Sequence, residues 1–131
     1  MVEPAPAAQR LAILLWSARP DDPERCAAPF VYAAVAAAMD CEVEVHFAGP
    51  AVTLLLPGVA ETAFPGKERS KSLYQFMQDA AEHGARFVAC SMAVSEHLAG
   101  RPERIPELDR VVGAASFVQR TLDPAWRTLV F

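Results

Sequence analysis

Leu11-Ala12-Ile13-Leu14-Leu15-Trp16 is an unbroken apolar run near the start of the chain. A strand that is buried on both faces of a parallel sheet has such a run, whereas a half-exposed strand alternates apolar and polar residues. The residues that follow end the run and begin a helix, because Asp22 can cap a helix and Pro23 suits its first position. This succession predicts a parallel sheet whose strands are connected by helices.

The first predicted helix extends from Pro23 to about Met39 and is rich in alanine. Pro29 lies inside it, so either the helix kinks there or its regular part starts near Ala28. From Phe30 onward the segment is apolar nearly all round, which is typical of a helix that is buried on more than one side. We therefore expect another subunit to cover part of this helix.

Strands and helices continue to alternate toward the end of the chain. Strands are expected at residues 42–47, 86–89, 108–112 and 126–131, and helices at residues 92–99, at residues 114–122 and after a capping Ser70. Residues 51–56 are ambiguous between a short helix and a strand, and residues 57–69 are expected to form a loop. Short connections between alternating elements predict a three-layer α/β sandwich around a mainly parallel sheet of about five strands.

Length and charge restrict the organisation and the partners of the chain. Its 131 residues suit a single domain, residues 1–131, with residues 1–9 expected to form a flexible N-terminal tail. A net charge of −4 argues against a nucleic-acid partner, which would require clustered lysines and arginines. No apolar run approaches the roughly 20 residues that span a bilayer, so we expect no membrane partner.

The lack of signal-peptide features near the start of the sequence and the cysteine usage lead us to expect a cytoplasmic protein. The first residues lack the basic region and apolar stretch of a signal peptide. The chain has three cysteines, an odd number, and none are spaced as CxxC. A disulfide framework is therefore not expected, and a reducing compartment suits the protein.

Cys90 is the most informative residue for function. It stands in Arg86-Phe87-Val88-Ala89-Cys90-Ser91-Met92, where a short apolar strand ends and a helix begins. A thiol at such a junction faces unpaired backbone N–H groups and the positive end of the helix dipole, which stabilise an anion. Such a site can lower a thiol pKa from about 8.5 toward neutrality. Cys90 is thus a candidate nucleophile, with the N–H groups of Ser91 and Met92 stabilising its thiolate; alternatively, it packs as a small apolar residue.

Other candidate residues are supported less well. His46 lies near the end of the second strand, at the same edge of the sheet as Cys90. It could act as a base or proton shuttle, or it could be one polar member of an alternating strand. Cys26 could resolve a disulfide, although packing explains it more simply, and Cys41 is expected to be a packing or surface thiol. The dispersed cysteines and histidines predict no metal site, and the single glycines predict no phosphate-binding loop.

The order of these segments resembles the DsrE/DsrF-like family of small sulfur-handling proteins, from about Leu11 to Phe131. Its most specific parts are Ala89-Cys90-Ser91-Met92-Ala93 after the mid-chain strand and Val111-Val112-Gly113-Ala114-Ala115-Ser116-Phe117-Val118 before the terminal strand. The resemblance implies a flavodoxin-like sandwich and a homo-oligomer, commonly a trimer or hexamer.

The resemblance also implies a function. In sulfur-relay members the matching cysteine accepts sulfane sulfur as a persulfide and passes it on, and Cys90 would inherit that role. We therefore expect a sulfur carrier or sulfurtransferase-like protein that needs no cofactor and exchanges sulfur with a donor or acceptor protein. Whether it is an enzyme stays open. The alternative is a non-catalytic oligomeric module that binds a small ligand at the carboxyl ends of the strands, with Cys90 only lining the pocket.

Overall fold

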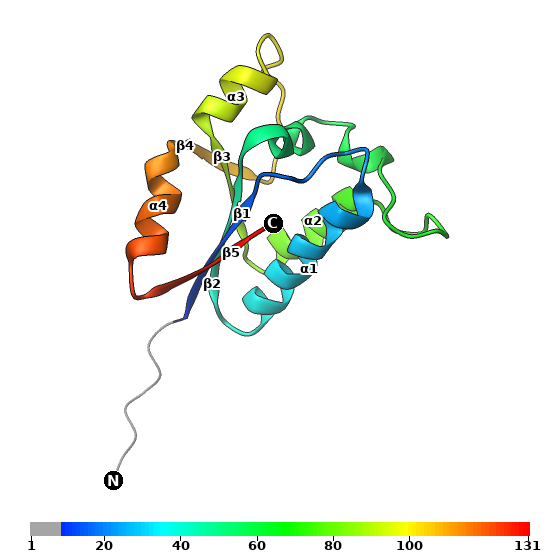
Figure 1. The fold of residues 1–131 in the computed structure, drawn as a ribbon. Helices are drawn as coiled ribbons and strands as arrows, with labels where there is room; N and C mark the ends of the chain where they lie inside the picture. Colours follow the sequence, from blue (N-terminus) through cyan, green and yellow to red (C-terminus); the bar gives the residue numbers. More distant parts are fainter. Residues whose placement is uncertain (1–8) are drawn as a thin grey trace.

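A five-stranded parallel sheet forms the centre of the computed structural model, which describes residues 9–131 (Figure 1). The strands lie in the order β4-β3-β2-β1-β5, and each neighbouring pair is parallel. Their bounds are β1 Arg10–Leu15, β2 Glu42–Phe47, β3 Arg86–Cys90, β4 Leu108–Val112 and β5 Trp126–Val130. The predicted α/β class is confirmed. The tail expected at residues 1–9 lies outside the described residues, apart from Gln9.

Helices cover the two faces of the sheet unequally. The helices are α1 Pro23–Ala38, α2 Leu73–Glu82, α3 Ser91–His97 and α4 Ala114–Leu122. The first two pack against each other on one face, whereas α4 lies over the other face and α3 projects beyond the end of the sheet (Figure 1). One face is therefore closed by two helices, and the other is only partly covered.

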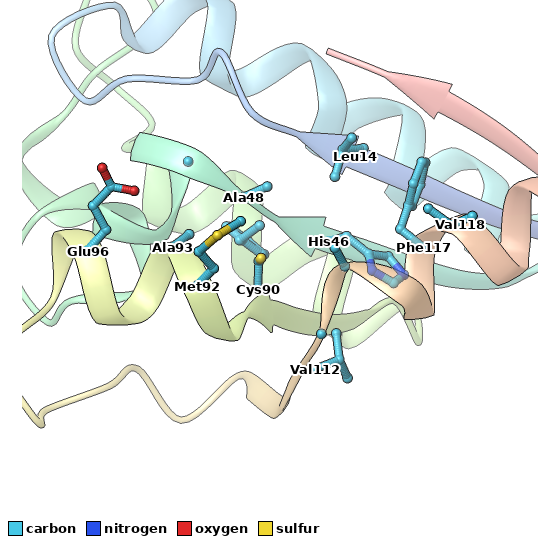
Figure 2. Close-up of a pocket in the computed structure, with 14 residues that line it drawn as sticks. Leu14, His46, Ala48, Cys90, Met92, Ala93, Glu96, Val112, Phe117 and Val118 are labelled. Atoms are coloured by element: carbon cyan, nitrogen blue, oxygen red, sulfur yellow. The ribbon is translucent and has the colours of Figure 1, made fainter.

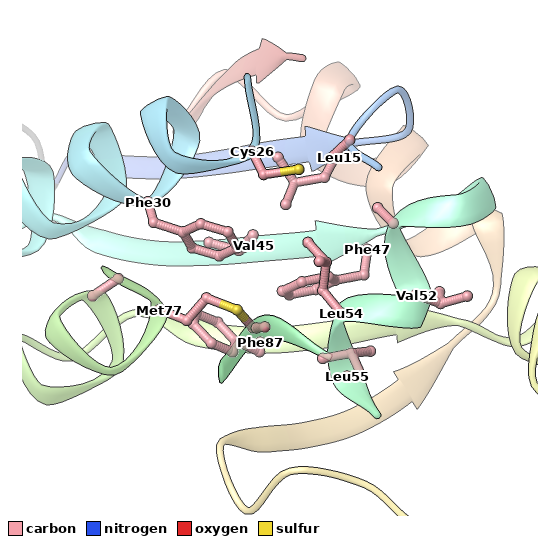
Figure 3. Packing of buried hydrophobic residues seen from close by; sticks show 14 of the residues in the cluster. Leu15, Cys26, Phe30, Val45, Phe47, Val52, Leu54, Leu55, Met77 and Phe87 are labelled. Atoms are coloured by element: carbon pink, nitrogen blue, oxygen red, sulfur yellow. The ribbon is translucent and has the colours of Figure 1, made fainter. Parts of the chain in front are cut away.

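The face under α1 and α2 holds the aromatic centre of the core. Phe30 from α1, Phe47 from β2 and Phe87 from β3 are fully buried, and their ring centroids are 5.3 to 5.9 Å apart (Figure 3). Met77 from α2 is also fully buried in this cluster. These contacts join two helices to the central strand β2 and its neighbour β3, so they determine how the helical layer lies on the sheet.

Two segments that were ambiguous in the sequence have definite structures. The first helix continues from Pro23 through Pro29 to Ala38, so its regular part does not start at Ala28. The segment after β2 forms a 3-10 helix, η1 Gly49–Leu55. Gly49 has φ of +53°, and a Cβ there would lie 3.3 Å from the Trp16 carbonyl oxygen, so this turn favours glycine.

The cap of α2 differs from the sequence-based prediction. Ser72, not Ser70, is the N-cap: its Oγ accepts a hydrogen bond from the Gln75 backbone N–H at 3.2 Å. The Gln75 side chain in turn accepts from the Ser72 backbone N–H at 2.8 Å. Ser72 is the cap because its spacing to Gln75 completes a capping box, which satisfies two otherwise unpaired donors.

Replacing the capping serine tests this correction. We expect Ser72→Ala to lower the free energy of unfolding by about 1 kcal/mol, because it leaves a backbone donor of α2 unpaired. Ser70→Ala, the matched control, should change it by less than about 0.5 kcal/mol. Urea unfolding followed by circular dichroism measures both, and equal effects of the two substitutions would contradict the assigned cap.

Candidate functional site

A pocket of about 320 Å³ opens at the carboxyl edge of the sheet, between α3 and α4 (Figure 2). All strands of a parallel sheet end at the same edge, and the connecting helices begin there, so a crevice forms at this edge. Most of the pocket wall is apolar and includes Leu14, Phe47, Met92, Val112, Phe117 and Val118. The strands β1 to β4 and both helices contribute to this wall.

Cys90 is half-buried and forms part of this wall. It is the last residue of β3 and the N-cap of α3, where an extended backbone (φ −72°, ψ 123°) leads into the first helical turn. Met92 also lines the pocket, whereas the exposed Ser91 is not among the lining residues. Of the three residues predicted at this junction, two therefore meet at the pocket through their side chains.

His46 lines the same pocket from β2 and is only 4% exposed. Its Nε2 lies 3.0 Å from Oε1 of the buried Glu44, and its ring packs edge-on against Phe117 with centroids 5.3 Å apart. An ionised carboxylate only accepts hydrogen bonds, so Nε2 carries a proton and donates a hydrogen bond to Glu44. In the neutral ring, Nδ1 is then left as an acceptor.

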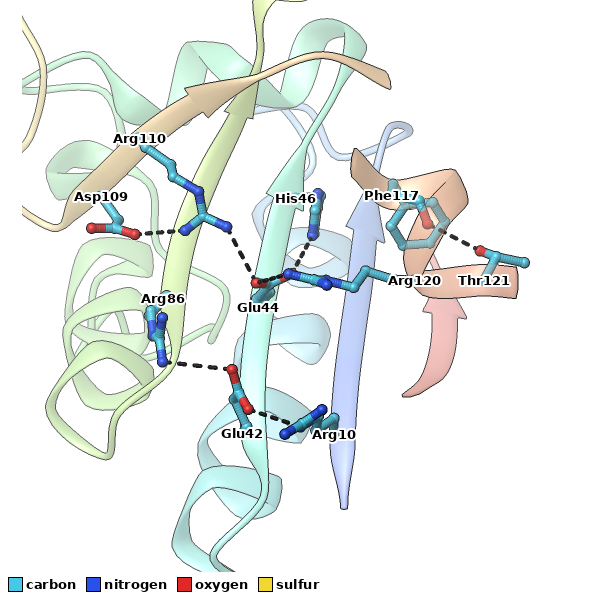
Figure 4. Close-up of polar contacts among 10 residues, drawn as sticks. All are labelled: Arg10, Glu42, Glu44, His46, Arg86, Asp109, Arg110, Phe117, Arg120 and Thr121. Carbon is cyan, nitrogen blue, oxygen red and sulfur yellow. Dashed lines mark hydrogen bonds and ion pairs between the residues drawn. The ribbon is translucent and has the colours of Figure 1, made fainter. Parts of the chain in front are cut away.

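Glu44 is the centre of a charged cluster on the partly covered face of the sheet (Figure 4). Arg120 from α4 donates two hydrogen bonds to it, from Nε to Oε1 and from Nη2 to Oε2, each 3.0 Å long. Arg110 from β4 donates to Oε2 from its Nη2 at 3.3 Å. The Arg120 guanidinium also lies over the Trp126 ring, 4.2 Å from its centroid. Both carboxylate oxygens are thus satisfied, and the bidentate arrangement holds α4 on the sheet.

The cluster determines the protonation states of Glu44 and His46. Burial acts to raise the pKa of Glu44, but hydrogen bonds from Arg120 and His46 and the charge of Arg120 outweigh it and bring the pKa to about 2. Burial lowers the pKa of His46 more than the neighbouring carboxylate raises it, and the charges of Arg120 and Arg110 lower it further. At neutral pH, Glu44 is therefore ionised and His46 is neutral.

The other two cysteines lie outside the pocket. Cys26 is a fully buried residue of α1 in the main core, and its Sγ donates to the Arg19 carbonyl oxygen at 2.9 Å. Burial raises the pKa of its thiol to about 11, so this thiol stays protonated at neutral pH. Cys41 is half-buried before β2, and its Sγ is 3.7 Å from Oε1 of Gln9. The structure therefore does not bring Cys26 to Cys90.

In residues 9–131, no three or more histidine, cysteine, aspartate or glutamate side chains are placed to share a metal ion. Over the same residues, no helix combines the length and the apolar character needed to cross a membrane.

Sequence reasoning missed Glu44 and its two arginine partners. The alternation of Glu42, Glu44 and His46 along β2 was visible, but it did not show that the second and third positions are buried. The usable signal was that Glu44 and His46 lie in a strand of a predicted parallel sheet. Helices usually cover both faces of such a sheet, so polar side chains there need partners. Arg110 and Arg120 are 66 and 76 residues away from Glu44, so their role depends on the tertiary fold.

A model of one protein family matches the chain over residues 11–131, and this family is described as DsrE/DsrF-like. The chain belongs to the DsrE/DsrF-like family. This confirms the resemblance and is consistent with sulfur relay at the level of the family. No curated protein matches the sequence.

Two solved structures share the fold of this DsrE/DsrF-like protein. The ychN protein from E. coli has a TM-score of 0.71 and 14% sequence identity, covering 93% of this chain and 99% of its own. MTH1491 from Methanobacterium thermoautotrophicum, a protein of unknown function, has a TM-score of 0.58 and 16% identity, covering 94% of this chain and 98% of its own. At these identities the likeness concerns the fold, so any chemistry must be argued from the pocket.

Removing the buried charge tests the cluster. We expect Glu44→Gln to lower the free energy of unfolding by about 1–3 kcal/mol near neutral pH, because it weakens hydrogen bonds to two guanidinium groups. Glu42→Gln is the matched control on the same strand: its carboxylate pairs with Arg10 and Arg86, its side chain is 37% exposed, and we expect a change below about 1 kcal/mol. Urea unfolding measures both, and equal losses would contradict a special role for Glu44.

The same cluster predicts how stability depends on pH. The folded-state pKa values of His46 and Glu44 are both lowered, so the unfolded chain binds more protons and stability falls on acidification. The loss begins as the pH falls below the ordinary histidine value of 6.5. A second loss occurs between 4.5 and about 2, where the Glu44 carboxyl is protonated in the unfolded chain but still ionised in the folded protein. Glu44→Gln should lack the second loss in urea titrations across this range. A stability that rises on acidification from neutral pH would contradict this interpretation.

Proposed function

We propose that the protein is a sulfur carrier or sulfurtransferase-like protein that holds sulfane sulfur as a persulfide on Cys90 and passes it to a partner thiol. The observation that carries the proposal is the position of this thiol: it lines an open, apolar pocket in a member of the DsrE/DsrF-like family. Exchange of sulfur with a donor or acceptor protein in the cytoplasm is part of the same proposal.

Both transfer steps exchange one sulfur–sulfur bond for another. The Cys90 thiolate attacks the terminal sulfur of a donor persulfide, the donor's own sulfur–sulfur bond breaks, and the donor leaves as a thiolate. The partner thiolate then attacks the terminal sulfur on Cys90, and the Cys90 thiolate leaves. No net oxidation occurs, so neither step requires a redox cofactor.

Two groups near Cys90 would assist these steps. Because Cys90 is the N-cap of α3, the backbone N–H groups of Ser91 and Met92 belong to the unpaired donors of its first turn and would stabilise the thiolate. His46 would act as an auxiliary base: Glu44 holds its Nε2–H, and the neutral ring keeps Nδ1 free to accept a proton in the pocket. Cys26 takes no part in this proposal, since it is protonated and does not line the pocket.

Sulfur loading tests the proposal directly. After incubation with a cysteine desulfurase and cysteine, we expect the intact mass to rise by one sulfur atom, and peptide mapping to place this atom on Cys90. Cys90→Ser should abolish the gain, and Cys41→Ser, the matched control, should retain it. His46→Gln should slow loading about tenfold at neutral pH. Loading that persists in Cys90→Ser would refute the proposal.

A second candidate function is favoured by the pocket itself. Its volume and apolar wall are typical of sites for small organic ligands, so the protein could be a binding module in which Cys90 only contacts the ligand. The two functions differ in how they depend on the thiol. If Cys90→Ser keeps both ligand affinity and the cellular role, the binding module is the correct function.

We also propose that the chain forms a homo-oligomer through the outer face of α1, with a trimer or hexamer as the expected state. An exposed apolar stripe consists of Val31, Tyr32 and Val35 on this helix and Met39 at its C-cap. Tyr32 stacks on Phe131 at a centroid distance of 5.8 Å, which extends the stripe to the end of the chain beside the edge strand β5. A continuous apolar surface of this kind favours burial against another copy.

A charge within this stripe tests self-association. We expect Val35→Lys to weaken association by about 30-fold or more, because the ammonium group would have to be desolvated in the interface. Ser70→Lys adds the same charge on an exposed loop and should leave the oligomer unchanged. Size-exclusion chromatography with light scattering, over a range of protein concentrations, gives the oligomeric state. A monomeric wild-type protein would refute the proposed interface.

A further inference from the structure

We infer that the pocket selects an uncharged alkyl or aryl thiol, or its persulfide, as the molecule that exchanges sulfur with Cys90, and discriminates against thiols that carry carboxylates. The inference rests on the proposed function for its sulfur-transfer step. Its selectivity, however, follows from the pocket wall alone, and three features of the wall support it.

The first feature is the charge at the pocket. The described residues that line it include one acidic side chain, Glu96, and no lysine or arginine. It lies on α3, one helical turn after Met92 (Figure 2). The nearby guanidinium groups of Arg110 and Arg120 are bound to Glu44 and do not line the pocket. An entering anion would therefore meet a like charge and no lining cation.

The second feature is the apolar entrance. Met92 on α3 is 69% exposed and Val118 on α4 is 53% exposed, and both line the pocket. Two apolar side chains from opposite helices thus present surface that a bound molecule can cover. Covering such surface favours an alkyl or aryl group, whereas a carboxylate would lose hydration without gaining a partner.

The third feature is the single polar side chain in the inner wall besides the thiol. His46 donates its Nε2–H to Glu44, so its remaining ring nitrogen can only accept a hydrogen bond while the ring is neutral. A neutral group with a donor fits this nitrogen, and a carboxylate does not. The positive ends of α3 and α4 do favour negative charge, but this effect falls off within the first turn, so it acts on the reacting sulfur rather than on distant carboxylates.

Methanethiosulfonate reagents test the selectivity without a sulfur donor. The Cys90 thiolate attacks their sulfenyl sulfur, a mixed disulfide forms, and methanesulfinate leaves. We compare the neutral propyl reagent with the anionic 2-sulfonatoethyl reagent near neutral pH, and read the labelling of Cys90 by peptide mass analysis. The urea-unfolded chain provides the intrinsic ratio of the two rates. We expect the neutral-to-anionic ratio at Cys90 to be about tenfold higher in the folded protein.

Two further measurements separate the contributions of charge and apolar surface. Glu96→Gln should lower the ratio about threefold or more by accelerating the anionic reagent, with the neutral rate unchanged. Glu103→Gln, an exposed carboxylate outside the pocket, is the matched control and should leave the ratio unchanged. Lengthening the neutral reagent from ethyl to butyl should raise the rate at folded Cys90 about two- to threefold per methylene, but not in the unfolded chain.

The outcomes distinguish this inference from the proposed function. Equal neutral-to-anionic labelling ratios in the folded and the unfolded chain overturn the selectivity, even if Cys90 accepts sulfur from a desulfurase. A high folded ratio without any sulfur loading overturns the carrier function and keeps the selectivity of the pocket. If Glu96→Gln does not lower the neutral-to-anionic ratio, the role of Glu96 is overturned. If no reagent labels folded Cys90, both proposals are overturned, because the pocket then gives no access to the thiol.

Discussion

The pairing of Glu44 with Arg120 and Arg110 is the constraint on which the rest of the site depends. A buried carboxylate costs several kcal/mol to desolvate, by an order-of-magnitude estimate, and here three side chains from other positions compensate for it. Arg120 comes from α4 and Arg110 from β4, so one anion connects the helix, the central strand and the far strand. The same anion orients the His46 ring and thereby forms the inner wall of the pocket.

The two faces of the sheet differ in how they are covered and in what they bury. Under α1 and α2, aromatic and aliphatic side chains form a dense apolar core in which Cys26 is one more buried residue. On the other face, α4 covers only part of the sheet, and the strands present Glu44 and His46 there. The uncovered end of this face is where Cys90 meets the pocket. Incomplete coverage by helices therefore leaves the opening that Cys90 lines.

Local sequence patterns predicted much of the fold because their causes are local. The apolar run at residues 11–16 and the alternation at residues 42–47 correspond to β1 and β2 within one residue at each end. Errors occurred where two local solutions compete: Ser70 and Ser72 can both cap a helix, and only the side chain of Gln75 decides between them. At Pro29 the sequence left two alternatives open, and the structure has one helix from Pro23 to Ala38, packed against α2.

By itself, the sequence determined the order of strands and helices, the family, and the place of Cys90 where a strand meets a helix, because each depends on neighbouring residues. The tertiary structure decided which residues surround that thiol. Glu44 acquires its partners from positions 66 and 76 residues away, and the pocket wall combines four strands and two helices. Contacts at such separations arise only when the sheet forms in its particular strand order, so no local pattern in the chain could reveal them.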